Sequence, residues 1–352
     1  MKPIAIYDRI TRKRLAFLEN ANNISYMQQT NATWTGSFRL PSIDEKKQYC
    51  DLLNFVELWD IDGGGNDKYV GLFRIIEIIE ETGDNTDYIT YTLEHVMATL
   101  IESNLVGYSL YETNTIGEII TSLLALQEEE LWVLNECDYT KVLEYEFEDM
   151  NLLSCITSVT EMLNEKHYWT FNTQNFPWEM NLKKVSTTVP VTDVRYKKNI
   201  FKITKKKDTR SLCTKLWLYG AEVNGAKVNI SSVNNGDEFL VSSTGISTYG
   251  TIGMIINDDR FTKPKQLYNY GVALLAQLDK PLITYETTIE AINEGANLKI
   301  GDAVRIITDD GLDDILIVQE INKQDLSGAP NSGKITIGQG AVNIGLITKR
   351  FT

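Results

Sequence analysis

Residues 33–40 read TWTGSFRL, a stretch in which the larger apolar side chains of Trp34, Phe38 and Leu40 alternate with other residues. Successive side chains of a strand point to opposite faces of its sheet, so this two-residue period predicts a β-strand with one buried face. Short runs of strand-like sequence recur through the first hundred residues, at 4–7, 15–18, 55–61, 69–79 and 88–93. Turn residues separate them, and we predict a first antiparallel β-barrel over residues 1–100.

Helical periodicity begins after residue 107. Thr115 and Glu118 have the spacing of a capping box, in which the two side chains satisfy free amides at a helix start. Apolar residues then recur on one face, and a second stripe of this kind begins at Asn151. Aromatic strand-like sequence follows at 168–171 and 178–182, so we predict an α+β domain over residues 101–193.

The chain returns to strand-like sequence from residue 194. A segment rich in Gly, Asn and Ser then interrupts it, and Pro264 opens a helix that Pro281 stops. Further strand-like runs come after this helix. We predict a second, discontinuous β-barrel from 194–220 and 282–345, with an inserted β segment and helix over 221–281. The expected fold class is mainly β with α+β insertions.

Length and composition exclude several classes of protein. The 352 residues suffice for two or three domains, and a net charge of −14 disfavours sequence-specific nucleic-acid binding. The four cysteines form no CxxC pair, which indicates free thiols in a reducing cytoplasm. Neither an export signal nor a run of about 18 apolar residues occurs, so we expect synthesis in the cytoplasm and no membrane span.

The residues that most often carry catalysis are scarce. Only His95 and His167 are histidines, neither has a partner at metal-ligand spacing, and no nucleophile motif is present. We therefore predict no catalytic residue, no metal site and no cofactor. The acidic run 128–149 is interpreted as a solvated face, although a glycosidase pair of carboxylates within it stays an alternative.

Three loops resemble ligand-binding motifs only in part. Residues 328–334 read GAPNSGK, but Ile335 stands where a phosphate-binding loop requires Ser or Thr. The loop at 60–64 has Gly71 where a calcium loop has its final glutamate, and 309–314 is an acidic turn between two apolar strands. None of the three predicts a site.

The basic stretch 183–210 is the least ordinary feature of the chain. It carries a net charge of +8, which leaves −22 on the remainder. Such an uneven distribution of charge suits docking onto a neighbouring copy or partner. A solvated loop is the alternative interpretation of the same charges. We expect 205–207 to form an exposed turn. The candidate contact residues are Lys197, Lys198, Lys202, Lys205, Lys206 and Lys207.

Several short motifs occur in an order that resembles the N-terminal baseplate hub region of phage tail-associated proteins, the prophage tail or tail endopeptidase family. They are Ile6-Tyr7-Asp8, 34–41 (WTGSFRLP), Glu94-His95-Val96, Asn151-Leu152-Leu153, Lys198-Asn199-Ile200, 215–220 (KLWLYG), 300–304 (IGDAV) and Ile337-Gly338. The resemblance spans essentially the whole chain.

This resemblance implies two tail-tube-like β-barrels with smaller domains, assembled as a homotrimer around a channel for DNA. Six barrels in the trimer would match a sixfold tail tube or the distal tail protein ring. The implied function is a structural hub at the tail tip of the virion, which closes the tail tube and connects it to the host-recognition device. Further implied partners are the tape measure protein and receptor-binding proteins.

The family name also implies an alternative function, a peptidoglycan hydrolase that acts on the host cell wall during genome entry. In the family this activity belongs to a C-terminal region, whereas the present sequence ends at Thr352, soon after the last expected barrel strand. The matched positions are structural, so no enzymatic activity is expected of these residues.

Overall fold

The computed structural model describes residues 2–62, 65–81, 87–161, 163, 165–195, 203–259, 261–288, 298–307, 311, 313–329 and 333–338. Strands predominate, and buried side chains form three separate hydrophobic clusters. The first lies in a large sheet, the second mainly in the middle of the chain and the third in the segment after residue 210.

The first hundred residues form consecutive strands of a thirteen-stranded sheet. Trp34, Phe38 and Leu40, from the stretch that predicted a strand, are all buried in its core. Two 3-10 helices, Glu45–Tyr49 (η1) and Val96–Ile101 (η2), interrupt the strands. The strands are β1 (Ile4–Tyr7), β2 (Arg14–Leu18), β3 (Asn22–Gln29), β4 (Thr35–Pro41), β5 (Phe55–Ile61), β6 (Asp67–Glu80) and β7 (Tyr88–His95).

Strands from the end of the chain continue the same sheet. The two halves meet where β3 pairs with β21, with Lys323 opposite Tyr26. The resulting strand order is β14-β19-β22-β21-β3-β4-β7-β6-β5-β1-β2, with β20 joining β21 and β13 joining β20. The added strands are β13 (Thr192–Arg195), β14 (Thr204–Asp208), β19 (Leu282–Thr288), β20 (Ala303–Ile307), β21 (Asp313–Lys323) and β22 (Gly333–Gly338).

We predicted two separate β-barrels, but the described part of the chain does not form two separate closed barrels. β2 and β14 lie at opposite ends of one continuous path of strands. One cluster of buried side chains also serves both halves, with Leu58 and Phe73 from the first and Val318 and Ile337 from the second. The prediction of a mainly β fold is confirmed. How the strands group into sheets depends on pairings between distant segments, and the local periodicity of the sequence carries no information about these.

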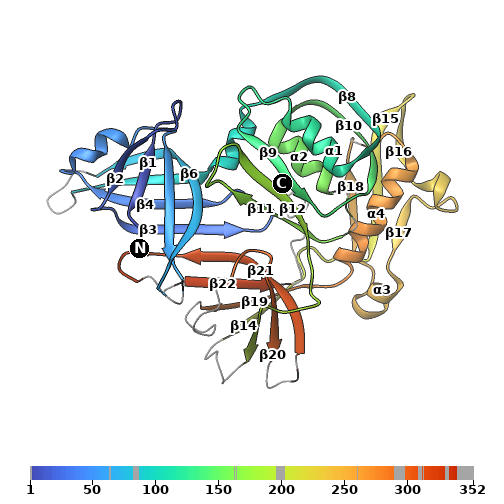
Figure 1. Ribbon diagram of the computed structural model, residues 1–352. Helices are drawn as coiled ribbons and strands as arrows, with labels where there is room; N and C mark the ends of the chain where they lie inside the picture. Colours follow the sequence, from blue (N-terminus) through green and yellow to red (C-terminus); the bar gives the residue numbers. More distant parts are fainter. Residues whose placement is uncertain are drawn as a thin grey trace.

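The middle of the chain combines helices with two small sheets around the second cluster (Figure 1). The predicted capping box is present, because Thr115 accepts from the Glu118 amide and Glu118 accepts from the Thr115 amide. The helices are α1 (Ile116–Leu124) and α2 (Leu152–Glu161). The strands are the antiparallel pair β8 (Asn104–Thr115) and β10 (Val142–Asn151), and the sheet of β9 (Trp132–Cys137), β11 (His167–Asn172) and β12 (Trp178–Lys184).

The third cluster lies in a four-stranded sheet covered by helix α4 (Pro264–Leu278). Helix and sheet approach closely at Gly271, where a Cβ atom would lie 2.0 Å from a methyl carbon of Leu218. The strand expected at 212–219 belongs here and not to the large sheet. The other elements are β15 (Lys215–Val223), β16 (Ala226–Asn229), β17 (Phe239–Val241), β18 (Gly253–Asn257), helix α3 (Ser243–Tyr249) and the 3-10 helix η3 (Ser231–Val233).

An ion pair is buried close to the junction of the two halves of the large sheet. Lys323 Nζ on β21 lies 2.6 Å from Asp60 Oδ2 on β5, and the Asp60 side chain is fully buried. The Tyr26 hydroxyl on β3 donates to the same oxygen at 2.9 Å. Asp60 is therefore an internal structural group.

Two other expectations, the free cysteines and the strand that follows residue 332, are confirmed. The four cysteines are free thiols, and three of them are buried. Residues 333–338 form a strand, where a phosphate-binding loop would have to open a helix. Within the described ranges, no helix is both long and apolar enough to cross a membrane.

Candidate assembly surface

The lysine run 205–207 lies in β14, a strand at the end of the large sheet. Among described residues β14 pairs only with β19, with Lys206 opposite Thr284, and all three lysines are exposed. The prediction of exposure is confirmed, but the predicted turn is a strand. Pairing with β19 extends the backbone, which the local run of three lysines did not indicate.

The remaining candidate contact residues divide by position. Lys197, Lys198 and Lys202 lie outside the described residues. Other basic residues of the stretch form ion pairs within the chain, Lys183 with Glu136 and Lys184 with Glu165. Of the described basic residues in this stretch, β14 therefore carries the most concentrated exposed positive charge.

The geometry of β14 suits contact with an acidic partner. Lysine side chains on an edge strand discourage unspecific pairing with other edges, and they leave the strand available to a surface of opposite charge. Alternation places Lys205 and Lys207 on one face and Lys206 on the other. Lys205 Nζ also lies 5.6 Å from the centre of the Tyr285 ring, which restrains that side chain beside the sheet.

A second exposed surface was missed in the sequence. Val106, Tyr108 and Leu110 alternate along β8 and are 87%, 59% and 46% exposed. The facing strand β10 presents Glu146 and Glu148, which pair in register with Leu110 and Tyr108. We call this surface, the outward side chains of these five residues, the β8–β10 face. Its signal was present as apolar alternation over 106–110, but that segment lay at the start of the predicted α+β domain, where no strand was expected.

One histidine, His95, is packed inside the protein, and the other, His167, is half-buried. His95 is fully buried against the rings of Trp34 and Phe171, and its Nδ1 accepts from the Met97 amide at 3.2 Å at the start of η2. Burial lowers the pKa of His95 to about 3, and that of His167 to about 4. Both are therefore neutral at pH 7, and the structural interpretation of His95 agrees with its surroundings.

The acidic run 128–149 is spread over several elements. Glu129 pairs with Arg12, Glu136 on β9 pairs with Lys183, and Glu146 on β10 accepts from Tyr108. β9 and β10 belong to different sheets. In the part of the chain that the structure describes, no group of three or more His, Cys, Asp or Glu side chains is arranged to hold a metal ion.

Comparison with known structures shows which proteins share this fold. A prophage tail protein, gp18, from Listeria monocytogenes EGD-e matches 99% of this chain and 97% of its own, with 16% identity and a TM-score of 0.64. A tail protein from Neisseria meningitidis MC58 matches 98% of this chain and 98% of its own, with 11% identity and a TM-score of 0.63. A 43 kDa tail protein of prophage MuSo2 from Shewanella oneidensis matches 96% of this chain and 98% of its own, with 13% identity and a TM-score of 0.64. The chain thus has the fold of prophage tail proteins.

The family comparison points the same way. Residues 187–345 match the family described as prophage endopeptidase tail. No curated protein matches the chain in sequence. The resemblance to phage tail-associated proteins that the ordered motifs indicated is therefore confirmed.

Proposed function

We propose that this chain is a structural baseplate hub at the tail tip of a phage or prophage particle. The observation that supports it most is the fold match over 99% of this chain and 97% of a prophage tail protein. A component of a type VI secretion system from E. coli, described as similar to the T4 tail proteins gp27 and gp5, also shares the fold, with a TM-score of 0.51 over 90% of this chain. In this proposal the hub closes the tail tube and connects it to the host-recognition device.

The proposed assembly is a homotrimer around a channel for DNA. Each chain supplies two strand-rich halves, so a trimer presents six tube-type units to the distal tail protein ring above it. The net charge of −14 suits a channel whose lining does not hold the DNA phosphates. The tape measure protein and receptor-binding proteins are the further proposed partners.

The subunit contact that we propose joins β14 of one copy to the β8–β10 face of the next. Lys205 and Lys207, which share one face of β14, meet Glu146 and Glu148, while Val106 and Leu110 supply apolar area to the contact. Because the two surfaces differ, the contact is heterologous, and a rotation of one third of a turn closes it into a ring of three. Exposed charge pairs of this kind mainly set the association rate and the salt dependence.

Light scattering on the purified chain tests the assembly. We expect a species of about 120 kDa at micromolar concentration, three times the chain mass of 39.9 kDa. Reversal of lysines 205–207 to Glu should slow and weaken assembly at low salt, with an unchanged circular dichroism spectrum. Glu146→Lys and Glu148→Lys in the same chain should restore it. A stable dimer, or no rescue by the second pair, contradicts the proposed contact.

A matched control separates a local contact from a general effect of charge. Lys13, Lys227 and Lys265 are exposed and lie in other parts of the chain. Reversing these three to Glu changes the net charge by the same amount and should leave assembly unaffected. Equal losses in the two triple variants would show that β14 has no special role.

The hub proposal also includes the absence of hydrolase activity. Incubation with purified host peptidoglycan should release neither reducing sugars nor new amines. Release that is lost on replacing a carboxylate within 128–149 would favour the tail endopeptidase alternative instead.

A further inference from the structure

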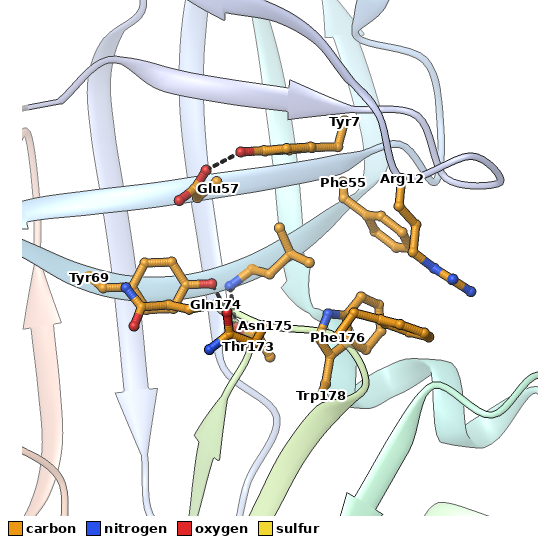
Figure 2. A pocket seen from close by; sticks show the side chains of 11 residues that line it. Tyr7, Arg12, Phe55, Glu57, Tyr69, Thr173, Gln174, Asn175, Phe176 and Trp178 are labelled. Atoms are coloured by element: carbon orange, nitrogen blue, oxygen red, sulfur yellow. Dashed lines mark hydrogen bonds between the residues drawn. The ribbon is translucent and has the colours of Figure 1, made fainter.

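A small aromatic pocket lies where the loop between β11 and β12 meets the first strands of the large sheet (Figure 2). Phe55, Tyr69 and Trp178 form part of its wall, and Phe176 is half exposed at its edge. Its volume is about 150 Å³. In another protein an apolar cavity of about 150 Å³ binds one benzene molecule, so this pocket has room for a single six-membered ring.

The pocket contains a carboxylate that the protein holds in a fixed position. Trp59 Nε1 donates to Glu57 Oε1 at 2.9 Å. Tyr7 donates its hydroxyl to Glu57 Oε2 at 2.6 Å (Figure 2). Burial and this bond raise the pKa of Tyr7 to about 12, so the hydroxyl stays a donor at neutral pH. A carboxylate has about four acceptor positions, which leaves Glu57 able to accept from a ligand.

The pocket is also lined by a positive group, the guanidinium of Arg12. The Arg12 guanidinium lies 3.9 Å from the centre of the Phe176 ring and pairs with Glu129. Its Nε atom is buried and makes no hydrogen bond to a described residue. A buried donor of this kind is rare without an acceptor, so it favours a ligand that brings one.

The loop residues that complete the pocket are uncharged amides. Gln174 and Asn175 are exposed at its rim, and each carries both a donor and an acceptor. Behind them Thr173 is fixed, because its hydroxyl accepts from the Leu72 amide and bonds the Tyr69 hydroxyl. The rim is thereby anchored to β6, and the site is formed without a ligand.

These groups together select among ligand classes. A cation would be attracted by Glu57 and repelled by Arg12. An anion would be attracted by Arg12 and repelled by Glu57. A purely apolar ligand would bury the Arg12 Nε without an acceptor and would leave the remaining acceptor positions of Glu57 unused, which is costly. A hydroxyl group donates to Glu57 and accepts from Arg12, while the C–H face of a sugar ring packs on the negative face of an aromatic ring. We propose that this pocket binds one neutral sugar residue. The inference is independent of the hub proposal, so either can fail alone.

Saturation-transfer NMR on the full chain tests the pocket with named probes. These are methyl α-D-glucopyranoside, N-acetylglucosamine and L-rhamnose, with choline and acetate as charged competitors. We expect at least one neutral sugar to bind with a dissociation constant on the order of millimolar, as befits a ligand of this size. Neither charged compound should displace it.

Two variants and one control identify the site. Phe176→Ala removes the aromatic edge and Glu57→Gln removes the charged acceptor, and each should weaken binding by about tenfold or more. Tyr249→Ala removes a half-exposed aromatic ring from α3, in another part of the chain, and should change nothing. Circular dichroism checks that each variant is folded. Absence of binding by all three sugars, displacement by choline, or equal binding by Phe176→Ala would overturn the proposal.

Discussion

Replacement of Lys323 by Met should loosen the junction between the two halves of the large sheet. The change leaves the Asp60 carboxylate buried without the ammonium that lies 2.6 Å from it. Removing one partner of a buried ion pair costs about 3–5 kcal/mol. Asp60 keeps two donors, the Tyr26 hydroxyl at 2.9 Å and the Ile61 amide at 2.7 Å. We therefore expect the lower end of that range, about 3 kcal/mol.

Native-state hydrogen exchange is the suitable assay, because the chain has three hydrophobic clusters and need not unfold in one step. Peptides that cover β3 and β21 should lose about 3 kcal/mol of opening free energy in Lys323→Met. Addition of Asp60→Asn should restore part of it, since the remaining group carries no unpaired charge. As a control, Lys334→Met breaks an exposed pair with Glu286 on neighbouring strands and should cost at most about 1 kcal/mol.

The reasoning fails under two results. A loss below about 1 kcal/mol in Lys323→Met would mean that the pair contributes no more than a surface ion pair. A double variant that is less stable than Lys323→Met alone would show that the charge on Asp60 is not the source of the cost.

Three further predictions concern buried groups. Burial lowers the pKa of Lys68 from 10.5 to about 8, so between these pH values the native state holds fewer protons than the unfolded chain. The free energy of unfolding of the wild type should therefore rise relative to Lys68→Met as pH increases from about 8 to 10.5, as measured by urea denaturation. Burial likewise lowers the pKa of His95 to about 3, so relative to His95→Phe the wild type should lose about 3 kcal/mol as pH falls from 6.5 to 4. Gly271→Ala should destabilise the third cluster by about 1–3 kcal/mol in thermal denaturation, because its Cβ would overlap the buried side chain of Leu218.

Each of these has a result that would contradict it. Parallel pH profiles for the wild type and Lys68→Met would show that the amine is solvated in the native state. If the difference in unfolding free energy between the wild type and His95→Phe stays the same from pH 6.5 to 4, the imidazole is protonated without opening the core. For Gly271→Ala, a loss no larger than that of the exposed Val272→Ala would show that helix α4 can shift away from β15.

Local patterns determined most of the secondary structure. The alternation of Trp34, Phe38 and Leu40 placed β4, because a two-residue period leaves a strand with one buried face. The pair Thr115 and Glu118 placed the start of α1, since a capping box depends on residues three apart. The ordered motifs also indicated the phage tail class. These features depend on neighbours in sequence, where the residues alone carry the information.

The basic stretch shows where sequence reasoning reached its limit. It identified the exposed charge of 205–207 but predicted a turn, because the partner strand β19 lies far away in the chain. Its other bases, such as Lys183, are paired with carboxylates of other strands, which net charge cannot reveal. A charge count gives the sum, whereas the fold decides which charges remain exposed.

Tertiary structure alone decided how the two ends of the chain combine and where the pocket lies. The pairing of β3 with β21 joins segments about three hundred residues apart, and neither sequence segment specifies the other. The pocket likewise brings Tyr7 and Glu57 from the large sheet beside Phe176 from a hairpin of the middle region. Each of these residues has an ordinary local context. Their chemistry depends on distances that only the packing of distant segments sets.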